Sequence, residues 1–256
     1  MASSTKKKKV WVLIIAAVVL IAAAIGAWLY FHRPVEEEDS LKTVSLENAS
    51  VGDIVLFGSY EQDDDMSNGE EQIAWDVWAK EDGKLLLVSH YGLENKQYNY
   101  EPAELTWEEC SLRTWLNEDF YQGHFTDQER EKIALSHLTT EDNVRWGTDG
   151  GNDTDDYVFL LSTRELQQYT NQPLDQKDPM RETQPTAYAV ANRAWYSGLE
   201  GYGKNSIFWW TRSPGPRKDC VACVMGDGVV MDGNQSCYVS QDHFSVRPAL
   251  WLDLTK

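Results

Sequence analysis

Residues 207–252 read IFWWTRSPGPRKDCVACVMGDGVVMDGNQSCYVSQDHFSVRPALWL. Short runs of β-branched and aromatic residues alternate here with turn sequences such as Ser213-Pro214-Gly215-Pro216 and Gly226-Asp227-Gly228. β-Branched and aromatic residues suit a pleated, half-buried surface, and Gly and Pro mark the turns between strands. The stretch therefore predicts five short strands, at 207–212, 221–225, 229–231, 237–240 and 246–252.

The region before this stretch contains more strands and then helices. Residues 53–58 predict a first strand, and a hairpin is expected around Asp82-Gly83, between strands at 73–80 and 85–89. Three capping-box sequences follow, at 106–109, 126–129 and 162–165, and each predicts a helix start. A short apolar strand is expected at 157–161. Strands at both ends with helices between them predict an α+β fold with an antiparallel sheet rather than a doubly wound one.

The charge of the chain bears on its partners. The formal net charge is −18, whereas a nucleic-acid-binding surface needs basic residues to neutralise phosphates. We therefore expect no nucleic-acid partner. The chain also lacks a Gly-x-Ser-x-Gly sequence, a His-Glu-x-x-His sequence and a phosphate-binding glycine loop. The sequence accordingly predicts a protein that is not an enzyme.

The segment from Val10 to Phe31 is uncharged and mostly apolar. As a helix these residues span about 33 Å, which is enough for the hydrocarbon core of a bilayer. Four lysines precede the segment and an acidic run follows it, so the chain after it is expected outside the cell membrane. A cleaved signal peptide is the alternative, but its apolar core is usually shorter. We expect a cytoplasmic tail (1–9), a transmembrane signal-anchor helix (10–31), an acidic stalk (32–48) and an extracellular domain (49–256).

Several segments in order resemble an uncharacterised bacterial family, a domain of unknown function frequent in exported proteins, over about residues 49–256. They are FGSY (57–60), IAWDV (73–77), LLLVS (85–89), TW (106–107), LRTWLN (112–117), VFLLS (158–162), PTAYA (185–189), WTRSP (210–214) and VRPALW (246–251). The family in turn is similar to the C-type-lectin-like fold of formylglycine-generating enzymes. This resemblance implies two or three helices packed on a small irregular antiparallel sheet, with ligands on the loop-rich face near the C-terminal strands.

Four aromatic residues are candidates for ligand binding: Trp146, Trp195, Tyr196 and Tyr202. They lie in polar, glycine-rich sequence, where exposed rings could stack on sugars or hold a peptide. The alternative is that they fix long loops onto the core. A shared recognition face requires residues 146–156 and 195–245 to line one concave surface.

Arg212 and Arg247 are two further candidates, because each lies beside apolar strand residues and close to a proline. In an acidic protein such guanidinium groups could bind a carboxylate or phosphate of a ligand. The alternative is that they pair with acidic neighbours and hold the last strand to the sheet.

An acidic loop, residues 149–156, offers the oxygen ligands Asp149, Asn152, Asp153 and Asp155. Hard oxygen ligands on a flexible backbone suit Ca²⁺, so calcium is the one candidate cofactor. The spacing is not that of an EF-hand, and the triplets that mark calcium-dependent sugar binding in C-type lectins are missing. A solvated acidic loop is the alternative.

The chain has four cysteines, and outside the membrane an even number favours disulfides. We expect Cys237 to pair with Cys220 or Cys223, and Cys110 to be buried and free. A zinc site formed with His243 and a redox Cys-x-x-Cys pair are alternatives.

These observations predict a membrane-anchored, surface-exposed binding module for a glycan, a peptide or a protein. One alternative is an oxidoreductase similar to formylglycine-generating enzymes, which would require Cys220 and Cys223 as accessible thiols. Another is a structural protein of the cell envelope.

Overall fold

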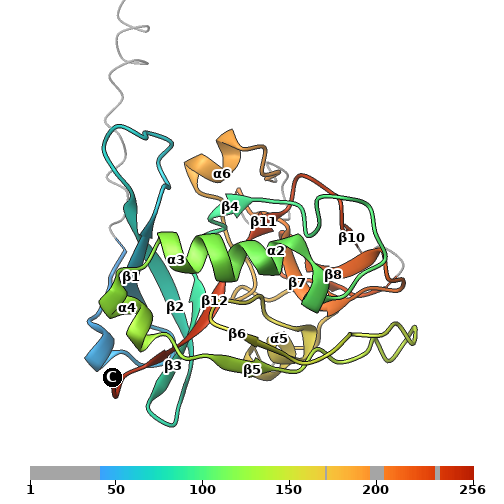
Figure 1. The fold of residues 1–256 in the computed structure, drawn as a ribbon, viewed down its shortest axis with the longest axis horizontal. Coiled ribbons are helices and arrows are strands. Elements are labelled where there is room, and N and C mark those ends of the chain that lie inside the picture. The colour runs from blue at the N-terminus through green and yellow to red at the C-terminus, as the bar shows by residue number, and fades with distance from the viewer. Residues whose placement is uncertain (1–40, 171, 197–204, 234–236) are drawn as a thin grey trace, which may run out of the picture. The chain divides into compact units, whose positions relative to one another are not determined.

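A computed structural model of the chain describes residues 41–256, except residue 171 and residues 197–204 and 234–236. The chain divides into two units, residues 1–42 and residues 43–256. The second unit has an α+β fold with a curled antiparallel sheet and short helices, shown in Figure 1.

The first sheet contains four antiparallel strands in the order β1-β2-β3-β12. They are β1 (Ile54–Tyr60), β2 (Glu71–Glu81), β3 (Lys84–Ser89) and β12 (Ala249–Asp253). The predicted hairpin around Asp82-Gly83 is confirmed, because Glu81 pairs with Lys84. Asp82 and Gly83 have φ angles of 47° and 76°, which is the conformation that a two-residue type I′ turn requires.

The second sheet has the strand order β10-β8-β7-β11-β4, and β9 also pairs with β8. Its strands are β4 (Glu94–Asn95), β7 (Trp209–Pro214), β8 (Cys220–Val224), β9 (Val230–Met231), β10 (Cys237–Tyr238) and β11 (Ser245–Val246). The pairing of β11 with β7 is parallel, and the other pairs are antiparallel. The predicted C-terminal strands thus exist, although several are shorter than expected.

The strand predicted at 246–252 is divided in two by Arg247-Pro248. Here the chain leaves the second sheet at β11 and joins the first sheet as β12. Pro248 lacks a backbone N–H and suits an interrupted ladder. The chain between β3 and β4 also passes from one sheet to the other, and it runs beside Arg247-Pro248. Ser89 N donates to Pro248 O at 2.9 Å, and Leu93 N donates to Val246 O at 3.0 Å. This corner joins the two sheets.

The helices lie mostly between the strand-rich regions. Residues 111–123 form one helical segment, made of α2 (Ser111–Trp115), a π-helical stretch (Leu116–Phe120) and α3 (Tyr121–Gly123), which crosses the front of the view in Figure 1. The other elements are the 3₁₀ turns Leu46–Asn48 and Trp107–Glu109, the helices α4 (Asp127–Lys132), α5 (Thr163–Thr170) and α6 (Ala187–Ala191), and the two-stranded sheet of β5 (Ser136–Leu138) and β6 (Thr154–Asp156).

Two of the three predicted capping boxes form. Glu129 N donates to Thr126 Oγ1 at 3.3 Å and Thr126 N donates back to the Glu129 carboxylate at 2.8 Å. Ser162 and Glu165 form the same reciprocal pair before α5. Thr106 makes no side-chain cap, because the chain there forms only a 3₁₀ turn.

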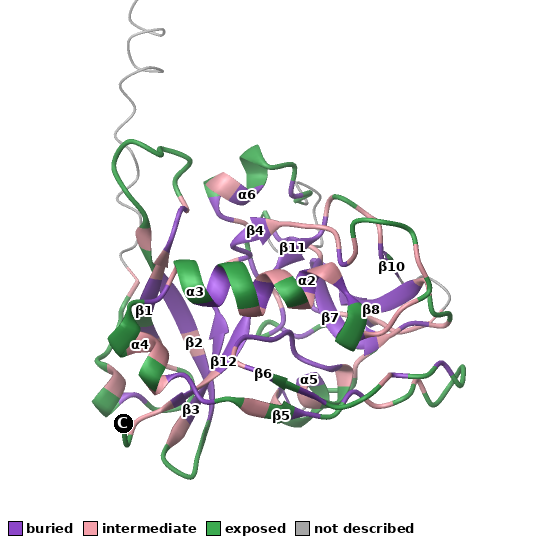
Figure 2. Cartoon of the chain, in the orientation of Figure 1, coloured by how far each residue is buried: buried purple, intermediate pink, exposed green. Residues whose placement is uncertain are grey.

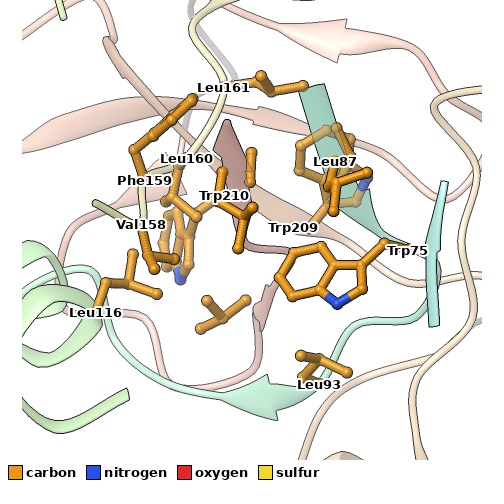
Figure 3. Close-up of a cluster of buried hydrophobic side chains, with 14 of the residues drawn as sticks. Trp75, Leu87, Leu93, Leu116, Val158, Phe159, Leu160, Leu161, Trp209 and Trp210 are labelled. Atoms are coloured by element: carbon orange, nitrogen blue, oxygen red, sulfur yellow. The ribbon is translucent and has the colours of Figure 1, made fainter. Parts of the chain in front are cut away.

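The predicted strand at 157–161 is wrong as a strand. Only Phe159 pairs in a ladder position, through an isolated bridge to Ala249, but Val158, Phe159, Leu160 and Leu161 are all buried. The run of apolar residues therefore reflects a segment that is buried on several sides, and not the alternating pattern of a strand. Figure 3 shows this segment packed with Trp75, Leu87, Trp209 and Trp210 of the two sheets. In Figure 2 the buried residues lie along the strands and the exposed ones along the connecting loops and outer helix faces.

The expected fold, a C-type-lectin-like domain behind a membrane-spanning helix, requires correction. The strands of the described residues form sheets of four, six and two strands rather than one small irregular sheet. At Arg247-Pro248 the chain leaves the second sheet and continues as a strand of the first sheet. Within the described part of the chain, no helix has the length and apolar character needed to cross a membrane. The expected tail (1–9) and transmembrane segment (10–31) lie outside the described residues, as do residues 32–40 of the expected stalk.

Replacing Thr126 by Ala should lower the free energy of unfolding by about 1 kcal/mol, because the Glu129 amide loses its cap. Chemical denaturation with circular dichroism would measure the change. Thr106→Ala is the matched control and should cost less than half as much, since Thr106 makes no cap. Equal losses in the two variants would contradict the assignment of the cap to Thr126.

Candidate functional site

A pocket with a volume of about 610 Å³ lies at the corner where the two sheets meet. One part of its wall comes from β2 and from the chain just after β3: Asp76, Val77, Trp78, His90 and Tyr91. The rest comes from Gly52, Ser206 and the segment Pro179, Met180, Glu182, Thr183 and Gln184. The volume is in the range that small-molecule sites occupy.

The segment that completes the pocket is held beside the corner by backbone hydrogen bonds. Gly92 pairs with Pro185 in a parallel bridge, and the Thr183 hydroxyl donates to His90 O at 2.6 Å. A Cβ at Gly92 would lie 2.2 Å from the Ile207 side chain and 2.8 Å from Ser245 Cβ. Glycine at position 92 thus allows this segment to approach Ile207 and Ser245 closely.

Asp76 is the charged centre of the pocket wall. Its Oδ1 lies 2.7 Å from His90 Nδ1, and its Oδ2 accepts a hydrogen bond from Arg247 Nη2 at 3.0 Å. The Asp76 and His90 side chains are 24% and 28% exposed, whereas the Arg247 side chain is 1% exposed. The buried guanidinium therefore fixes the carboxylate from behind, and the carboxylate orients the imidazole at the surface of the pocket.

Arg247 is buried between aromatic rings that come from the two sheets. Its guanidinium carbon lies 5.3 Å from the ring centre of Trp78 in β2 and 5.2 Å from that of Trp209 in β7. Arg247 Nε donates to Ser89 O at 2.8 Å and Nη1 donates to Met180 O at 3.2 Å. Burial lowers the pKa of Arg247 and the Asp76 carboxylate opposes that shift. The ion pair with Asp76, the two backbone carbonyls and the two aromatic rings together offset the cost of burying the charge of Arg247.

His90 lines the pocket and contacts Asp76 through Nδ1, which leaves Nε2 as the second ring nitrogen. A carboxylate at Nδ1 favours the tautomer that carries its proton on Nδ1, so Nε2 of the neutral ring is a hydrogen-bond acceptor. No hydrogen bond joins Nε2 to any described residue. The arrangement can accept a hydrogen bond from a ligand.

Ser206 and Glu182 add two further polar groups. Ser206 is 2% exposed, and its hydroxyl has no hydrogen-bond partner within the described chain. The pKa of Glu182 is raised by burial, and Asp227 and Asp178 raise it further while Lys177 lowers it. A buried hydroxyl without a partner costs about 1–3 kcal/mol, which a ligand could recover.

The sequence predicted one member of this site, Arg247, and gave two interpretations of it. Arg247 pairs with Asp76 and holds the last strand segment at the corner, rather than facing the pocket as a ligand contact. Arg212 has a comparable role elsewhere, because its guanidinium pairs with both oxygens of Glu165 and donates to Leu160 O and Thr139 O. Both arginines thus form the ion pairs with acidic neighbours that the second interpretation expected, and ligand binding by either one stays a prediction.

The four predicted aromatic residues do not share the pocket. Trp146 is 41% exposed and lies under Arg145, in the loop before β6. Trp195 packs on Phe208 with ring centres 4.4 Å apart, and the neighbouring Tyr196 bridges Ile207. Tyr202 lies outside the described residues. In Figure 1 the loop before β6 and the chain just after α6 lie at different edges of the unit, and no described pocket is lined by Trp146 together with Trp195 or Tyr196.

The residues proposed for calcium are engaged by different partners. Asp149 Oδ2 accepts from Lys218 Nζ at 3.4 Å, and the Asn152 amide donates to Glu108 at 2.9 Å. Asp153 and Asp155 both lie within 3.3 Å of the His137 ring nitrogens. They offer no convergent set of oxygens in the structure. Among the described residues, one group of three carboxylates does converge, formed by Glu61, Asp63 and Glu71.

The cysteines form one disulfide, between Cys223 and Cys237, which is one of the two pairings that the sequence left open. It joins β8 to β10 beside the register pair Cys237–Val221. Cys110 and Cys220 are buried and free. Burial raises the pKa of Cys110 to about 12 and that of Cys220 to about 11. At neutral pH both thiols are therefore protonated and poor nucleophiles.

Sequence reasoning missed Asp76, His90 and Ser206. Asp76 is a charged residue inside an apolar strand, Ile73 to Val77, and a buried charge in such a run usually has a partner. That signal marks a network but not its members, because Arg247 is 171 residues away along the chain. The sequence around His90 and Ser206 contains no motif.

Replacing Arg247 by Met should lower the free energy of unfolding by about 3 kcal/mol, because Asp76 loses its buried partner. Chemical denaturation would measure the loss. The double variant Asp76→Asn with Arg247→Met should recover part of it, since no unpaired charge remains. A loss below 1 kcal/mol in the single variant would contradict a stabilising role for the pair.

Thiol labelling should find no rapidly reacting cysteine in the native, oxidised chain at pH 8, because Cys110 and Cys220 are buried and protonated. Unfolding should expose two thiols, and unfolding with reduction should expose four. Mass spectrometry after alkylation would count them. Rapid labelling of Cys220 in the native chain would refute the assignment.

The comparisons with known proteins agree with part of the sequence resemblance. Residues 82–254 match the family described as Domain of unknown function (DUF6273). No curated protein and no solved structure matches the chain, and nothing in these comparisons supports the lectin-like fold. The match covers more than half of the sequence and includes β3, the helical region and the C-terminal strands. The chain therefore belongs to the DUF6273 family.

Proposed function

We propose that this chain is a binding module displayed outside the cell membrane, and that the Asp76 pocket is its ligand site. The observation that carries the proposal is the pocket itself. It combines a volume of about 610 Å³ with an imidazole whose orientation is fixed by a carboxylate and a buried guanidinium. Small-molecule sites typically combine a concave wall with a few fixed polar groups of this kind.

The polar network favours binding because its groups are held in place by contacts within the protein. His90 and Arg247 hold the Asp76 carboxylate from two separate segments of the chain, and the Thr183 hydroxyl donates a hydrogen bond to the His90 carbonyl. Groups held in place lose little conformational entropy when a ligand binds. The hydrogen bonds of the network can therefore contribute to affinity, because little conformational entropy is lost when the ligand binds.

An extracellular location is favoured by two independent features. Cys223 and Cys237 form a disulfide, and such bonds persist in oxidising compartments. The sequence before the domain carries four lysines and then the apolar segment from Val10 to Phe31, which favours export with attachment at the membrane. A ligand present outside the cell, such as a glycan or a peptide, is therefore the expected partner.

Binding is preferred over oxidoreductase chemistry because of the cysteines. An enzyme similar to formylglycine-generating enzymes would need Cys220 and Cys223 as accessible thiols. Cys223 is bonded to Cys237, and Cys220 is buried with a raised pKa. We accordingly propose recognition rather than turnover.

Glycan and peptide arrays probed with the full, oxidised chain test the proposal. The wild-type chain should bind a subset of these ligands, and Met180→Trp should lose at least nine-tenths of the signal, because an indole at this pocket-lining position fills the space. Met180 is 40% exposed, so the change need not disturb the core. Met66→Trp is the matched control, since Met66 is 74% exposed and lies away from the pocket.

The proposal fails if the wild-type chain binds nothing on either array. It also fails if Met180→Trp retains the same ligands with the same strength as Met66→Trp, since the binding surface would then lie elsewhere.

A further inference from the structure

We infer that the Asp76 pocket selects a neutral sugar, recognised by His90 Nε2 and the Ser206 hydroxyl. The inference rests on the proposed function, because it assigns a ligand class to the same site. It requires no calcium, and so differs from the metal-dependent sugar binding considered for the acidic loop.

The charge of Asp76 is already satisfied within the protein. One carboxylate oxygen lies 2.7 Å from His90 Nδ1, and the other accepts from Arg247 Nη2 at 3.0 Å. The guanidinium of Arg247 thus balances the charge of Asp76, and Arg247, which Trp78 and Trp209 cover, is not available for an anionic ligand. The Asp76–Arg247 pair orients the site, and His90 and Ser206 are left to contact the ligand.

The available groups suit hydroxyls. His90 Nε2 is an acceptor when Nδ1 holds the proton against Asp76, and a serine hydroxyl both donates and accepts. A sugar hydroxyl also both donates and accepts, so one ligand hydroxyl can give its proton to Nε2 and a neighbouring one can bond Ser206. Both residues line the same pocket, and neither atom has a hydrogen-bond partner among the described residues.

Of the two residues, Ser206 gives the stronger evidence for a ligand contact. Its side chain is enclosed by protein, and its hydroxyl lacks a partner. Rotation about the Cα–Cβ bond moves the hydroxyl among three staggered positions, so it can turn to a ligand that fills the pocket. An unpaired buried hydroxyl is costly in the free protein, and a ligand hydroxyl removes that cost.

The rest of the wall is compatible with a sugar ring. Trp78, Pro179 and Met180 supply apolar surface against which the C–H face of a sugar can pack. Glu182 supplies an acceptor near the mouth, where it is only partly buried. An additional negative charge on the ligand would meet Glu182 unfavourably.

Calorimetric titration of the full chain with matched monosaccharides tests the ligand class. The probes are glucose, galactose and N-acetylglucosamine as neutral sugars, glucosamine as the cationic analogue and glucuronate as the anionic one. At least one neutral sugar should bind at least fivefold more tightly than glucuronate, whose carboxylate Glu182 would repel. Met180→Trp should abolish the binding.

Ser206→Ala tests the residue assignment. It should weaken binding of the neutral sugar about fivefold, the size expected for one hydrogen bond. Ser245→Ala is a matched control, because the Ser245 hydroxyl is also buried and unpartnered but does not line the pocket. It should leave the affinity unchanged. Thermal unfolding of both variants checks that each is folded.

His90→Phe provides a second variant at a partly exposed position, and it removes the acceptor while keeping a ring of similar size. It should also weaken binding at least fivefold. His124→Phe is its control, since His124 pairs with Glu70 away from the pocket.

The outcomes separate this inference from the proposed function. If a charged sugar or a peptide binds more tightly than every neutral sugar, and Met180→Trp abolishes that binding, the ligand class is wrong and the binding module stands. If a neutral sugar binds equally well to Ser206→Ala and Ser245→Ala, the assigned contact is wrong. If nothing binds the pocket, both proposals fail.

Discussion

The guanidinium of Arg247, buried between Trp78 and Trp209, is the contact on which the arrangement of this domain depends. One indole belongs to the first sheet and the other to the second, and the arginine occupies the point where the chain passes from β11 to β12. A buried charge without partners costs several kcal/mol. Asp76, Ser89 O, Met180 O and two aromatic rings supply those partners only when both sheets are in place, so the contact makes sheet pairing cooperative.

The same contact explains why the pocket lies where it does. Two chain segments pass through the corner side by side, and their ladder is interrupted between Ser89 and Leu93 on one and at Arg247-Pro248 on the other. Interrupted ladders redirect side chains and leave space between strands. His90 lies in this interruption, and Asp76 reaches it from β2. Arg247 thus supports Asp76, and Asp76 in turn orients His90, the residue proposed to contact a ligand.

The cysteines contribute to a different part of the fold. The Cys223–Cys237 bond fastens β8 to β10, a strand of two residues at the edge of the second sheet. The pairing of so short a strand contributes few hydrogen bonds. The disulfide joins two residues separated by 14 positions, and this cross-link restricts the unfolded chain. The free thiols of Cys110 and Cys220 are buried, so neither sulfur atom is accessible at the surface.

The sequence by itself determined the α+β class, the Asp82-Gly83 hairpin, the two capping boxes at Thr126 and Ser162, and most strands of the C-terminal region. These features depend on neighbours within a few residues, where turn chemistry, capping and residue shape act directly. The sequence suggested the wrong sheet arrangement and placed a strand at 157–161, because an apolar run does not reveal which surfaces will cover it.

Only the tertiary structure decided the site. Asp76, His90, Ser206 and Arg247 come from separate segments of the sequence, and no local pattern shows that these four residues meet. Arg247 could be read from sequence either as a ligand contact or as a strand anchor, and the choice required knowing that Asp76 and two indoles surround it. The pairing energy of such groups depends on burial and distance across the fold, which local sequence patterns do not carry.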